Sequence, residues 1–328
     1  MTTRSDALTC SDVSHPFRFG VHLWRLPTKG WRARAQRYEQ AGFSTITLTD
    51  HMVVPQWEPF TGLSAIAAVT ERIGIGTLVL DAPLRDPVLT AKSAATLELL
   101  SGGRLELGVG AGYVSANFAA VGRVFEPAAT RLARLDEWVT LVRRLWTEPS
   151  TTMHGRFYQV ADSPMVAAEP VRPRLLVGGG GKHLLGLAGR MADTASLIPR
   201  QTSGAWSVTD SLPDSTLEHM IEKAAWVHQA ASAAGRDHQS IELNTMVSQV
   251  IVGDDPEGAI ASEAAAAGIT REQMADSTLY LCGTGSEVRD RLELWRQRTG
   301  LSYFSLFDPG DEQIDYLAEH VVGPLAGQ

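Results

Sequence analysis

The amino-acid sequence predicts a (β/α)8 TIM barrel, an α/β fold in which eight parallel strands close into a cylinder inside a ring of helices. From Phe17 onward, short β-rich runs alternate with helical runs, which is the pattern of βαβ units and of a parallel sheet. No Pro- or Gly-rich linker divides the chain, so these units favour one barrel over two domains. A doubly wound open sheet is the alternative.

The expected elements follow one another along the whole chain. Strands are expected in FRFGVHLW (17–24), FSTITLTD (43–50), RIGIGTLVL (72–80), RLELGVG (104–110), RLLVG (174–178), DTASLI (193–198), IELNTMVSQVIVG (241–253) and YFSLF (303–307). Helices are expected at 31–41, 63–72, 87–100, 130–146, 182–191, 217–234 and 286–298. Left-handed cap residues that end helices are expected at Gly42, Gly74, Gly102, Gly189 and Gly300.

The chain is expected to be one domain. Residues 1–16 are interpreted as a flexible leader and residues 17–328 as the barrel. Two connections are unusually long: 113–173, with a small strand in HGRFYQV, and the turn-rich 199–216. In a barrel we expect both insertions on the rim at the carboxyl ends of the strands, where substrates bind.

Composition excludes several classes of function. The formal net charge of -8 argues against broad affinity for nucleic acids or anionic membranes. The sequence has neither an apolar run of about 18 residues nor an apolar stretch near its start, so we expect a cytoplasmic protein. The two cysteines, Cys10 and Cys282, are too few for a disulfide framework or a zinc cluster, and no metal site is expected.

An acid and an imidazole end the second expected strand, in TLTDHM. Asp50 and His51 would both reach the barrel mouth, because the carboxyl ends of the strands meet there. Histidine can hold or pass a proton near neutral pH, and the aspartate can fix its tautomer or order a water molecule. We therefore expect both to be catalytic. The alternative is a loop hydrogen bond from Asp50 beside a histidine without a chemical role.

Three glycines alternate after the fourth expected strand, in LELGVGAGY. Their G-x-G-x-G spacing differs from the G-x-G-x-x-G of dinucleotide-binding loops, so such a loop is not expected. Gly108, Gly110 and Gly112 would instead let the backbone approach a flat ligand closely. The preceding strand runs into Asp81 and Arg85, which from the residues alone indicates a buried strand that leaves through a turn.

Four consecutive glycines separate the fifth expected strand from a helix, in LLVGGGGKHLLGLAG. The unpaired N–H groups at the start of that helix would form an anion site, to which Lys182 adds a positive charge. The sequence does not match a Walker A loop, because His183 follows the lysine. The alternative is that the glycines serve only close packing of helix on sheet. Under the first interpretation, a bulky residue at Gly180 would weaken ligand binding before it harms folding.

Aromatic residues gather near the expected strand ends. His22, Trp24, Trp57 and Tyr113 are candidates for lining an apolar pocket that holds a flat ring and a substrate. Taken one at a time, each of them fits equally well in a hydrophobic core.

Seven motifs in this order resemble the bacterial luciferase-like superfamily, and within it the actinobacterial branch of oxidoreductases that depend on the deazaflavin coenzyme F420. They are TLTDHM, IGIGTLVLDAPLRDP, LSGGRLELGVGAGY, RLARLDEWVTLVRRLW, HGRFY, LLVGGGGKHLLGLAGRMAD and LCGTGSEVRDRL. The resemblance extends from Phe17 to about Asp308.

The resemblance implies a flavin or deazaflavin ring in the barrel mouth, against a third-strand bulge with a non-prolyl cis peptide at Leu78–Val79. It implies that His51 stands near the redox carbon with Asp50 supporting it. The cofactor-binding residues that it implies are Leu78, Val79, Leu80, Val109, Gly110, Ala111, Gly112, Gly178, Gly179, Gly180, Gly181 and Lys182. Some relatives have an acidic proton donor where this chain has Tyr113, so a substrate that is neither phosphorylated nor a sugar is expected.

Three functions remain open. The leading hypothesis is a coenzyme F420-dependent oxidoreductase that reduces an activated C=C or C=N bond, with His51 as the proton donor and Tyr113 or His22 in reserve. The second is an FMN-dependent monooxygenase that receives reduced flavin from a partner reductase. The third is a non-catalytic flavin-binding barrel. The family resemblance also suggests a homodimer and a separate reductase for the cofactor.

Overall fold

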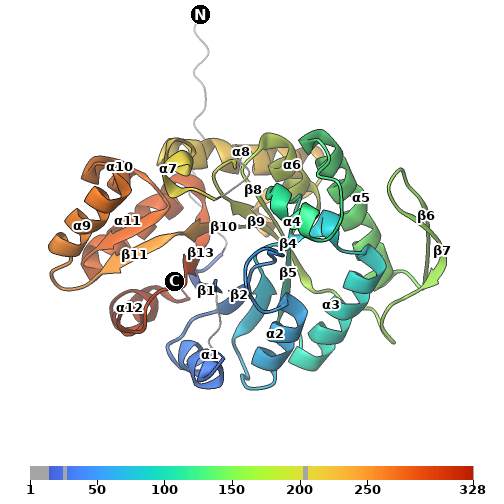
Figure 1. Cartoon of the computed structure of the whole chain (residues 1–328), viewed down its shortest axis with the longest axis horizontal. Helices are drawn as coiled ribbons and strands as arrows, with labels where there is room; N and C mark the ends of the chain where they lie inside the picture. The colour runs from blue at the N-terminus through green and yellow to red at the C-terminus, as the bar shows by residue number, and fades with distance from the viewer. Residues whose placement is uncertain (1–14, 25–27, 202–205, 328) are drawn as a thin grey trace, which may run out of the picture.

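A closed barrel of eight parallel strands, with helices outside it, forms the centre of the computed structural model, which describes residues 15–24, 28–201 and 206–327 (Figure 1). The barrel strands are β1 (Arg18–Leu23), β2 (Thr45–Leu48), β3 (Gly74–Thr77) continued by β4 (Leu80–Asp81), β5 (Leu105–Gly110), β8 (Arg174–Gly179), β9 (Thr194–Leu197), β10 (Glu242–Val247) and β13 (Leu301–Phe307). Pairing of β13 with β1 closes the barrel. The predicted fold is confirmed, and the open sheet is excluded. Most of the expected leader, residues 1–14, lies outside the described residues.

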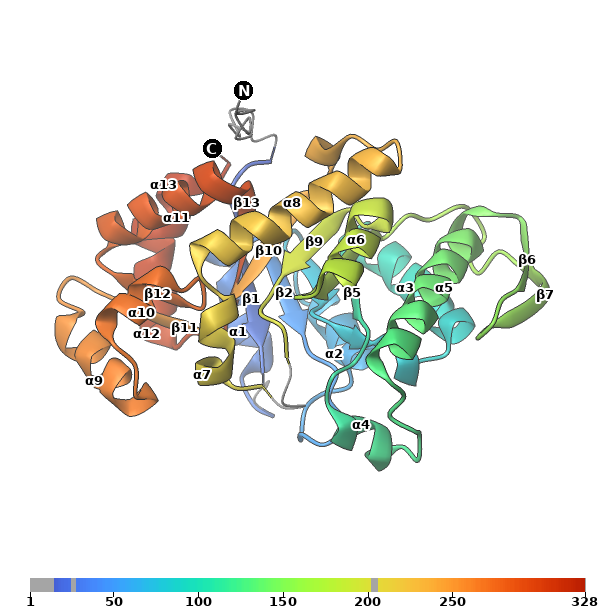
Figure 2. The ribbon, with the colours of Figure 1, turned by 90° about the horizontal axis from the view of Figure 1, so that it is seen from above.

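Helices surround the strands, as the view from above shows (Figure 2). Those that connect successive barrel strands are α1 (Trp31–Gln40), α2 (Pro59–Ala67), α3 (Pro87–Ser101), α5 (Ala128–Thr147), α6 (Lys182–Met191), α8 (Leu217–Ala233) and α11 (Gly285–Thr299). The other helices are α4 (Ser115–Ala120), α7 (Val208–Ser211), α9 (Glu257–Ala267), α10 (Arg271–Asp276), α12 (Asp311–Leu317) and α13 (Gly323–Leu325), with the segments η1 (Ala82–Leu84), η2 (Leu212–Asp214), η3 (His238–Ser240) and η4 (Ala318–Val322).

Helix α2 begins four residues before the expected position, because Glu58 caps it through the backbone N–H of Thr61. None of the helices in the described ranges has the length and apolar character that crossing a membrane requires.

Two of the five expected glycine caps are wrong. Gly42, Gly102 and Gly300 have positive φ angles after helices, as predicted. In contrast, Gly74 is the first residue of β3. Gly189 lies inside α6, where a Cβ atom would stand 2.3 Å from the carbonyl oxygen of Val227. That glycine therefore serves the close approach of α6 to α8.

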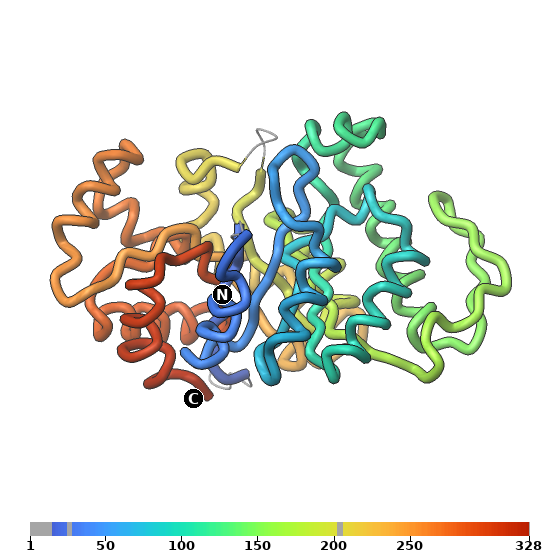
Figure 3. Tube along the Cα trace, turned by 60° about the horizontal axis from the view of Figure 1, so that its bottom comes forward, coloured from blue at the N-terminus to red at the C-terminus, as the bar shows by residue number. Residues whose placement is uncertain are grey.

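Two excursions leave the barrel. The expected seventh strand divides into β10 and β11 (Gln249–Val252), and β11 pairs in parallel with β12 (Tyr280–Gly283), a strand that was not predicted. On the other side of the molecule, β6 (Ser150–His154) and β7 (Gln159–Pro164) form a hairpin (Figure 3). Backbone N–H groups at its turn donate to Glu137 of α5, at 2.9 Å from Arg156 and 2.8 Å from Phe157. The hairpin thus packs along α5.

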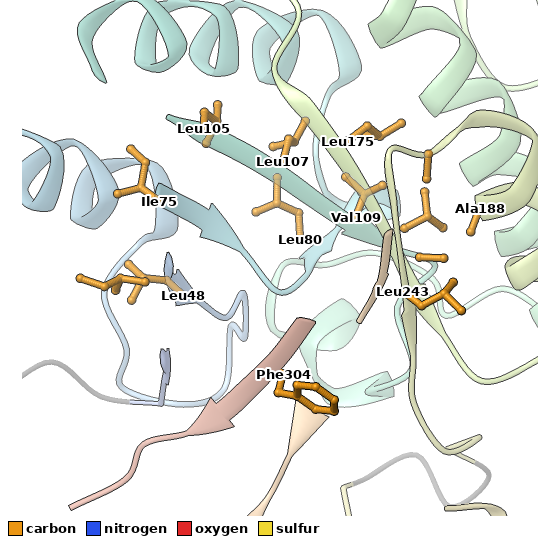
Figure 4. Close-up of a cluster of buried hydrophobic side chains, with 14 of the residues drawn as sticks. Leu48, Ile75, Leu80, Leu105, Leu107, Val109, Leu175, Ala188, Leu243 and Phe304 are labelled. Carbon is orange, nitrogen blue, oxygen red and sulfur yellow. The ribbon is translucent and has the colours of Figure 1, made fainter. Parts of the chain in front are cut away.

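The main core lies between the strands and the helices. Leu105, Leu107 and Val109 follow one another along β5, with Leu175 of β8 beside them and Ala188 on α6 (Figure 4). All five are buried. Alternate side chains of a barrel strand therefore face the helices, and those between them face the inside of the barrel.

Paired charges occupy the amino-terminal end of the barrel interior. Glu242 of β10 pairs with Arg18, and with Arg174 at 3.0 Å. Glu106 of β5 lies 3.5 Å from Arg174 and 3.7 Å from Arg18. The guanidinium of Arg18 also stacks over the ring of Tyr303, 4.2 Å from its centroid. Each buried carboxylate therefore has a cationic partner.

The third strand carries one extra residue. Gly76 pairs with Glu106 and Leu80 pairs with Val109, so β3 and β4 advance four residues where β5 advances three. The bond between Leu78 and Val79 in this bulge is cis, as expected. The Thr77 hydroxyl bridges the interruption: it donates to the Gly108 carbonyl at 2.7 Å and accepts from the Gly108 N–H at 2.9 Å.

The three alternating glycines of the fourth barrel strand and its loop face this bulge. A Cβ atom at Gly108 would lie 1.9 Å from the Thr77 carbonyl oxygen, and one at Gly110 would lie 2.8 Å from Val79 Cγ2. At Gly112, where φ is +70°, it would lie 2.3 Å from an oxygen of Asp81. The sequence predicts that these glycines let the backbone approach a ligand closely. In the structure, the third strand occupies the space in which their side chains would lie.

We expect Gly108→Ala to lower the free energy of unfolding by about 1 to 3 kcal/mol or more, because its methyl group overlaps a backbone oxygen that cannot rotate away. Gly253→Ala is the matched control, since a Cβ atom there has no atom within 4 Å. It should change stability by less than about 0.5 kcal/mol. Urea unfolding measures both values, and equal stability of the two variants would contradict this account of β5.

Candidate active site

Aromatic rings from four barrel strands meet at the mouth. Trp24 lies 5.5 Å from the ring of His51 and 5.7 Å from that of Phe307, measured between centroids. Phe307 is 5.5 Å from His22, and Tyr113 stands edge-on to His51 at 6.2 Å. We call these five residues the aromatic cluster. Sequence reasoning missed Phe307, although it ends the eighth strand as His22 nearly ends the first.

Trp57 lies outside the aromatic cluster. Its ring packs at 5.6 Å against Trp31, the first residue of α1, in an edge-to-face arrangement. It also covers Gly62 of α2, where a Cβ atom would lie 3.2 Å from the indole. The structure therefore gives Trp57 a packing role between two helices.

His22 and Tyr113 have settled protonation states near neutral pH. His22 is 3% exposed, and burial lowers the pKa of its imidazole to about 3. Its Nδ1 lies 2.9 Å from the Thr47 hydroxyl. Burial, and then the charge of Asp81, raise the pKa of the Tyr113 phenol to about 12. His22 is therefore neutral at pH 7, and Tyr113 keeps its proton.

Asp50 is oriented toward a partner other than His51. Its two oxygens accept from Nε and Nη2 of Arg85, both at 2.7 Å, and one also accepts from the Asp81 backbone N–H at 3.0 Å. Arg85 in turn reaches Glu58 at 3.1 Å. The expected direct support of His51 by Asp50 is absent from the described hydrogen bonds, because a bidentate guanidinium pair takes up the carboxylate.

Asn117 of α4 takes the place next to the imidazole. Its side chain is 1% exposed, and its Nδ2 lies 3.0 Å from Nδ1 of His51. Burial lowers the pKa of His51, and the nearby charge of Asp50 opposes this change. Asn117 escaped the sequence analysis, because a lone asparagine in the segment after GVGAGY carries no motif of its own.

Asp81 is a second buried carboxyl group behind the mouth. It is 6% exposed, and burial together with the charge of Asp50 raises its pKa to about 7. Arg131 and a hydrogen bond from the Asn117 side chain act in the opposite direction on this pKa. Its Oδ1 has no hydrogen-bond partner among the described residues. From the residues alone, only a turn is predicted at this position.

The glycine loop after β8 combines packing with an open helix start. Gly180 must lack a side chain, because a Cβ atom there would lie 2.5 Å from the carbonyl oxygen of Ile198, and a Cβ atom at Gly179 would displace the end of the Leu184 side chain, 2.0 Å away. A Cβ atom at Gly178 would lie 3.0 Å from Val79. Gly181 differs: it is the N-cap of α6, and a Cβ atom there would have no atom within 4 Å.

The start of α6 remains suited to an anion. The N-cap residue Gly181 has no side chain that could accept from the first N–H groups of the helix, and Lys182 is exposed in the first turn. Arg200, in the loop after β9, is also exposed. Because substitution of Gly180 would strike the backbone of 198–200, the expectation that it affects binding before folding is wrong, and Gly181 is the position for that test.

A model described as luciferase-like monooxygenase matches residues 13–265. The chain belongs to this family. A protein from Intrasporangium calvum, named F420-dependent glucose-6-phosphate dehydrogenase, is 28% identical over 341 residues, which cover 91% of this chain and 98% of the relative.

Solved structures share the fold. An F420-dependent secondary alcohol dehydrogenase in complex with an F420-acetone adduct superposes with a TM-score of 0.77 at 18% identity, covering 94% of this chain and 98% of that one. The monooxygenase RslO1 from Streptomyces bottropensis has a TM-score of 0.74 at 24% identity, covering 94% of this chain and 100% of that one.

The raised pKa of Asp81 predicts a pH dependence of stability. Between about pH 4 and pH 7 the folded carboxyl group keeps a proton that the unfolded chain has lost, so stability falls as the pH rises through this window. The slope is at most about 1.4 kcal/mol per pH unit. Asp81→Asn cannot titrate and should lack this contribution. Urea unfolding across the window checks it, and identical slopes for variant and wild type would refute the assignment.

Proposed function

We propose that this protein is a coenzyme F420-dependent oxidoreductase that transfers a hydride between the deazaflavin and a small organic substrate, in the direction that reduces an activated C=C or C=N bond. The observation that carries the proposal is the position of the aromatic cluster and the α6 amino terminus at the same end of one barrel. A flat ring with an anionic tail needs both. The names of the Intrasporangium relative and of the alcohol dehydrogenase support the choice of F420.

The residues present fit such a cofactor. The backbone of the bulge residues Leu78, Val79 and Leu80 and of the β5 end from Val109 to Gly112 forms the proposed support for the ring, because the side chains of Leu80 and Val109 face the helices. The tail phosphate would accept hydrogen bonds from the N–H groups of Gly181 and Lys182, with the helix dipole and the lysine charge adding attraction. When bound, the deazaflavin supplies or accepts the hydride.

The substrate is proposed to lie among the rings of His22, Trp24, Tyr113 and Phe307, facing His51. The cationic groups near this space are engaged: Arg85 is paired with Asp50, and Arg131 donates to the carbonyls of Ala111 and Gly112. This arrangement suits an uncharged substrate, neither a phosphate ester nor a sugar. The protein's task is to orient the two partners and exclude water.

An FMN-dependent monooxygenase is the second candidate, and the family's description favours it. FMN also combines a flat ring with a phosphate-bearing tail, so the glycine loop serves both cofactors equally well. Each reading includes a separate reductase that regenerates the cofactor. We also propose a homodimer in the cytoplasm.

Cofactor titration separates the two readings and tests the anion site. We expect the wild-type protein to bind F420 in a fluorescence titration, and Gly181→Asp to bind it at least about tenfold more weakly, because a carboxylate at the helix start repels a phosphate. Gly253→Asp adds the same charge elsewhere and should bind like the wild type. Tight FMN binding with no response to F420 would exclude the leading reading, and undiminished affinity of Gly181→Asp would exclude the anion site.

His51→Ala should lower hydride transfer by about 100-fold or more and leave F420 binding unchanged, because a group that assists only in the transition state is removed. Absorbance of reduced F420, followed with cyclohexenone and a cyclic imine as acceptors, measures the rate. A non-catalytic barrel instead predicts no transfer by the wild-type protein, or equal rates in both proteins.

A further inference from the structure

The orientation of the Asn117 amide is determined by its neighbours. Its Oδ1 accepts from the backbone N–H of Met52 at 3.0 Å. A reversed amide would place its NH2 group against that N–H, so that two donors would face each other. The Nδ2 group must therefore be the atom that lies 3.0 Å from Nδ1 of His51.

This orientation limits the states of the imidazole. Nδ2 only donates, so Nδ1 of His51 must offer its lone pair. The neutral ring then carries its proton on Nε2, and an imidazolium would direct a second proton from Nδ1 at the amide. A histidine in this contact cannot accept a proton on Nε2 without giving up the bond from Asn117.

We propose that Asn117 is a positioning residue that holds His51 as the neutral tautomer with its proton on Nε2, so that His51 acts as a fixed hydrogen-bond donor and not as the proton donor or base. The role assigned to this donor rests on the proposed function, whereas the tautomer assignment rests only on the contacts of Asn117.

The surroundings favour the neutral ring. Asp50 of the same loop is paired with Arg85, and His22 of β1 is neutral. Tyr113, after β5, keeps its proton, and the carboxyl group of Asp81, after the bulge, accepts a hydrogen bond from the side chain of Asn117, which also contacts His51. Burial further lowers the pKa of His51.

A fixed N–H donor suits the proposed reduction. When a hydride adds to an activated C=C or C=N bond, the displaced electron pair collects on an oxygen or nitrogen of the substrate. The Nε2–H group stabilises that charge as it develops, and a water molecule then supplies the proton. The hydride and the proton together complete the two-electron reduction.

The protonated nitrogen can be identified by NMR of the cofactor-free protein with nitrogen-labelled histidine rings. The chain has nine histidines, and the spectrum of His51→Gln assigns the signal. We expect the wild-type signal to show a neutral ring protonated on Nε2 throughout about pH 6 to 8, near the ordinary titration range of histidine. A proton on Nδ1, or an imidazolium at neutral pH, would overturn the proposal.

Exchanging the side chains of Asp81 and Asn117 tests whether Asn117 determines the tautomer of His51. The double variant Asp81→Asn/Asn117→Asp keeps the total charge but presents a carboxylate to Nδ1. It should move the proton to Nδ1 and raise the pKa of His51 by about 1 to 3 units. Asp81→Asn alone is the matched control and should keep the Nε2–H tautomer. A His51 spectrum that is unchanged in the double variant would contradict the role of Asn117.

Kinetics then tests the role of the donor. His51→Gln retains an N–H group that cannot titrate, so its rate of hydride transfer should be at least about tenfold higher than that of His51→Ala. Loss of such a donor lowers the rate by about 100- to 1000-fold in all. Equal rates of the two variants would show that proton transfer is required. Because the NMR measurement needs no cofactor, a failure of F420 to bind would remove the proposed function and leave the tautomer result standing.

Discussion

The packing of the third strand against three glycines decides which side chains reach the mouth of this barrel. Before the bulge, Gly76 faces the barrel interior, and one extra residue reverses this alternation. Leu80 therefore faces the helical layer beside Val109, while Asp81 faces inward against Gly112. Without the extra residue the leucine would face the mouth and the carboxylate would face an apolar core.

The charges of the site follow from this reversal. The backbone N–H of Asp81 reaches Asp50, and Arg85, four residues further on, closes on the same carboxylate. Asp50 is thereby turned toward the third strand, which leaves Nδ1 of His51 to Asn117. The raised pKa of Asp81 has the same origin, because the bulge buries the Asp81 carboxyl group beside the negative charge of Asp50. The nearby guanidinium of Arg85 is paired with Asp50. One irregularity in a strand thus sets the partners of four polar groups.

The sequence predicts the features that depend on local pattern. Strand and helix periodicity located the eight barrel strands, and the glycine run marked the start of α6 within one residue. The β-rich run 241–253 shows no sign of the point where β11 leaves the barrel, because Ser248 alone separates the two strands and neither Gly nor Pro stands between them. Asn117 and His51 are 66 positions apart, and no local pattern records such a contact. Asp81 and Arg85 resemble turn residues until the bulge brings them to Asp50.

The division of charge around the mouth gives the proposed cofactor only one orientation. On the side of the aromatic cluster, His22 is neutral, Tyr113 is protonated and Asp50 is paired. On the side of α6, Lys182 is exposed at a helix start that carries about half a positive charge, while Arg200 is paired with Asp214. The net charge of -8 does not cancel this attraction, since salt screens charges more than about 8 Å away. An anionic tail is therefore drawn to the glycine loop, which leaves the ring and an uncharged substrate facing the Nε2–H group of His51.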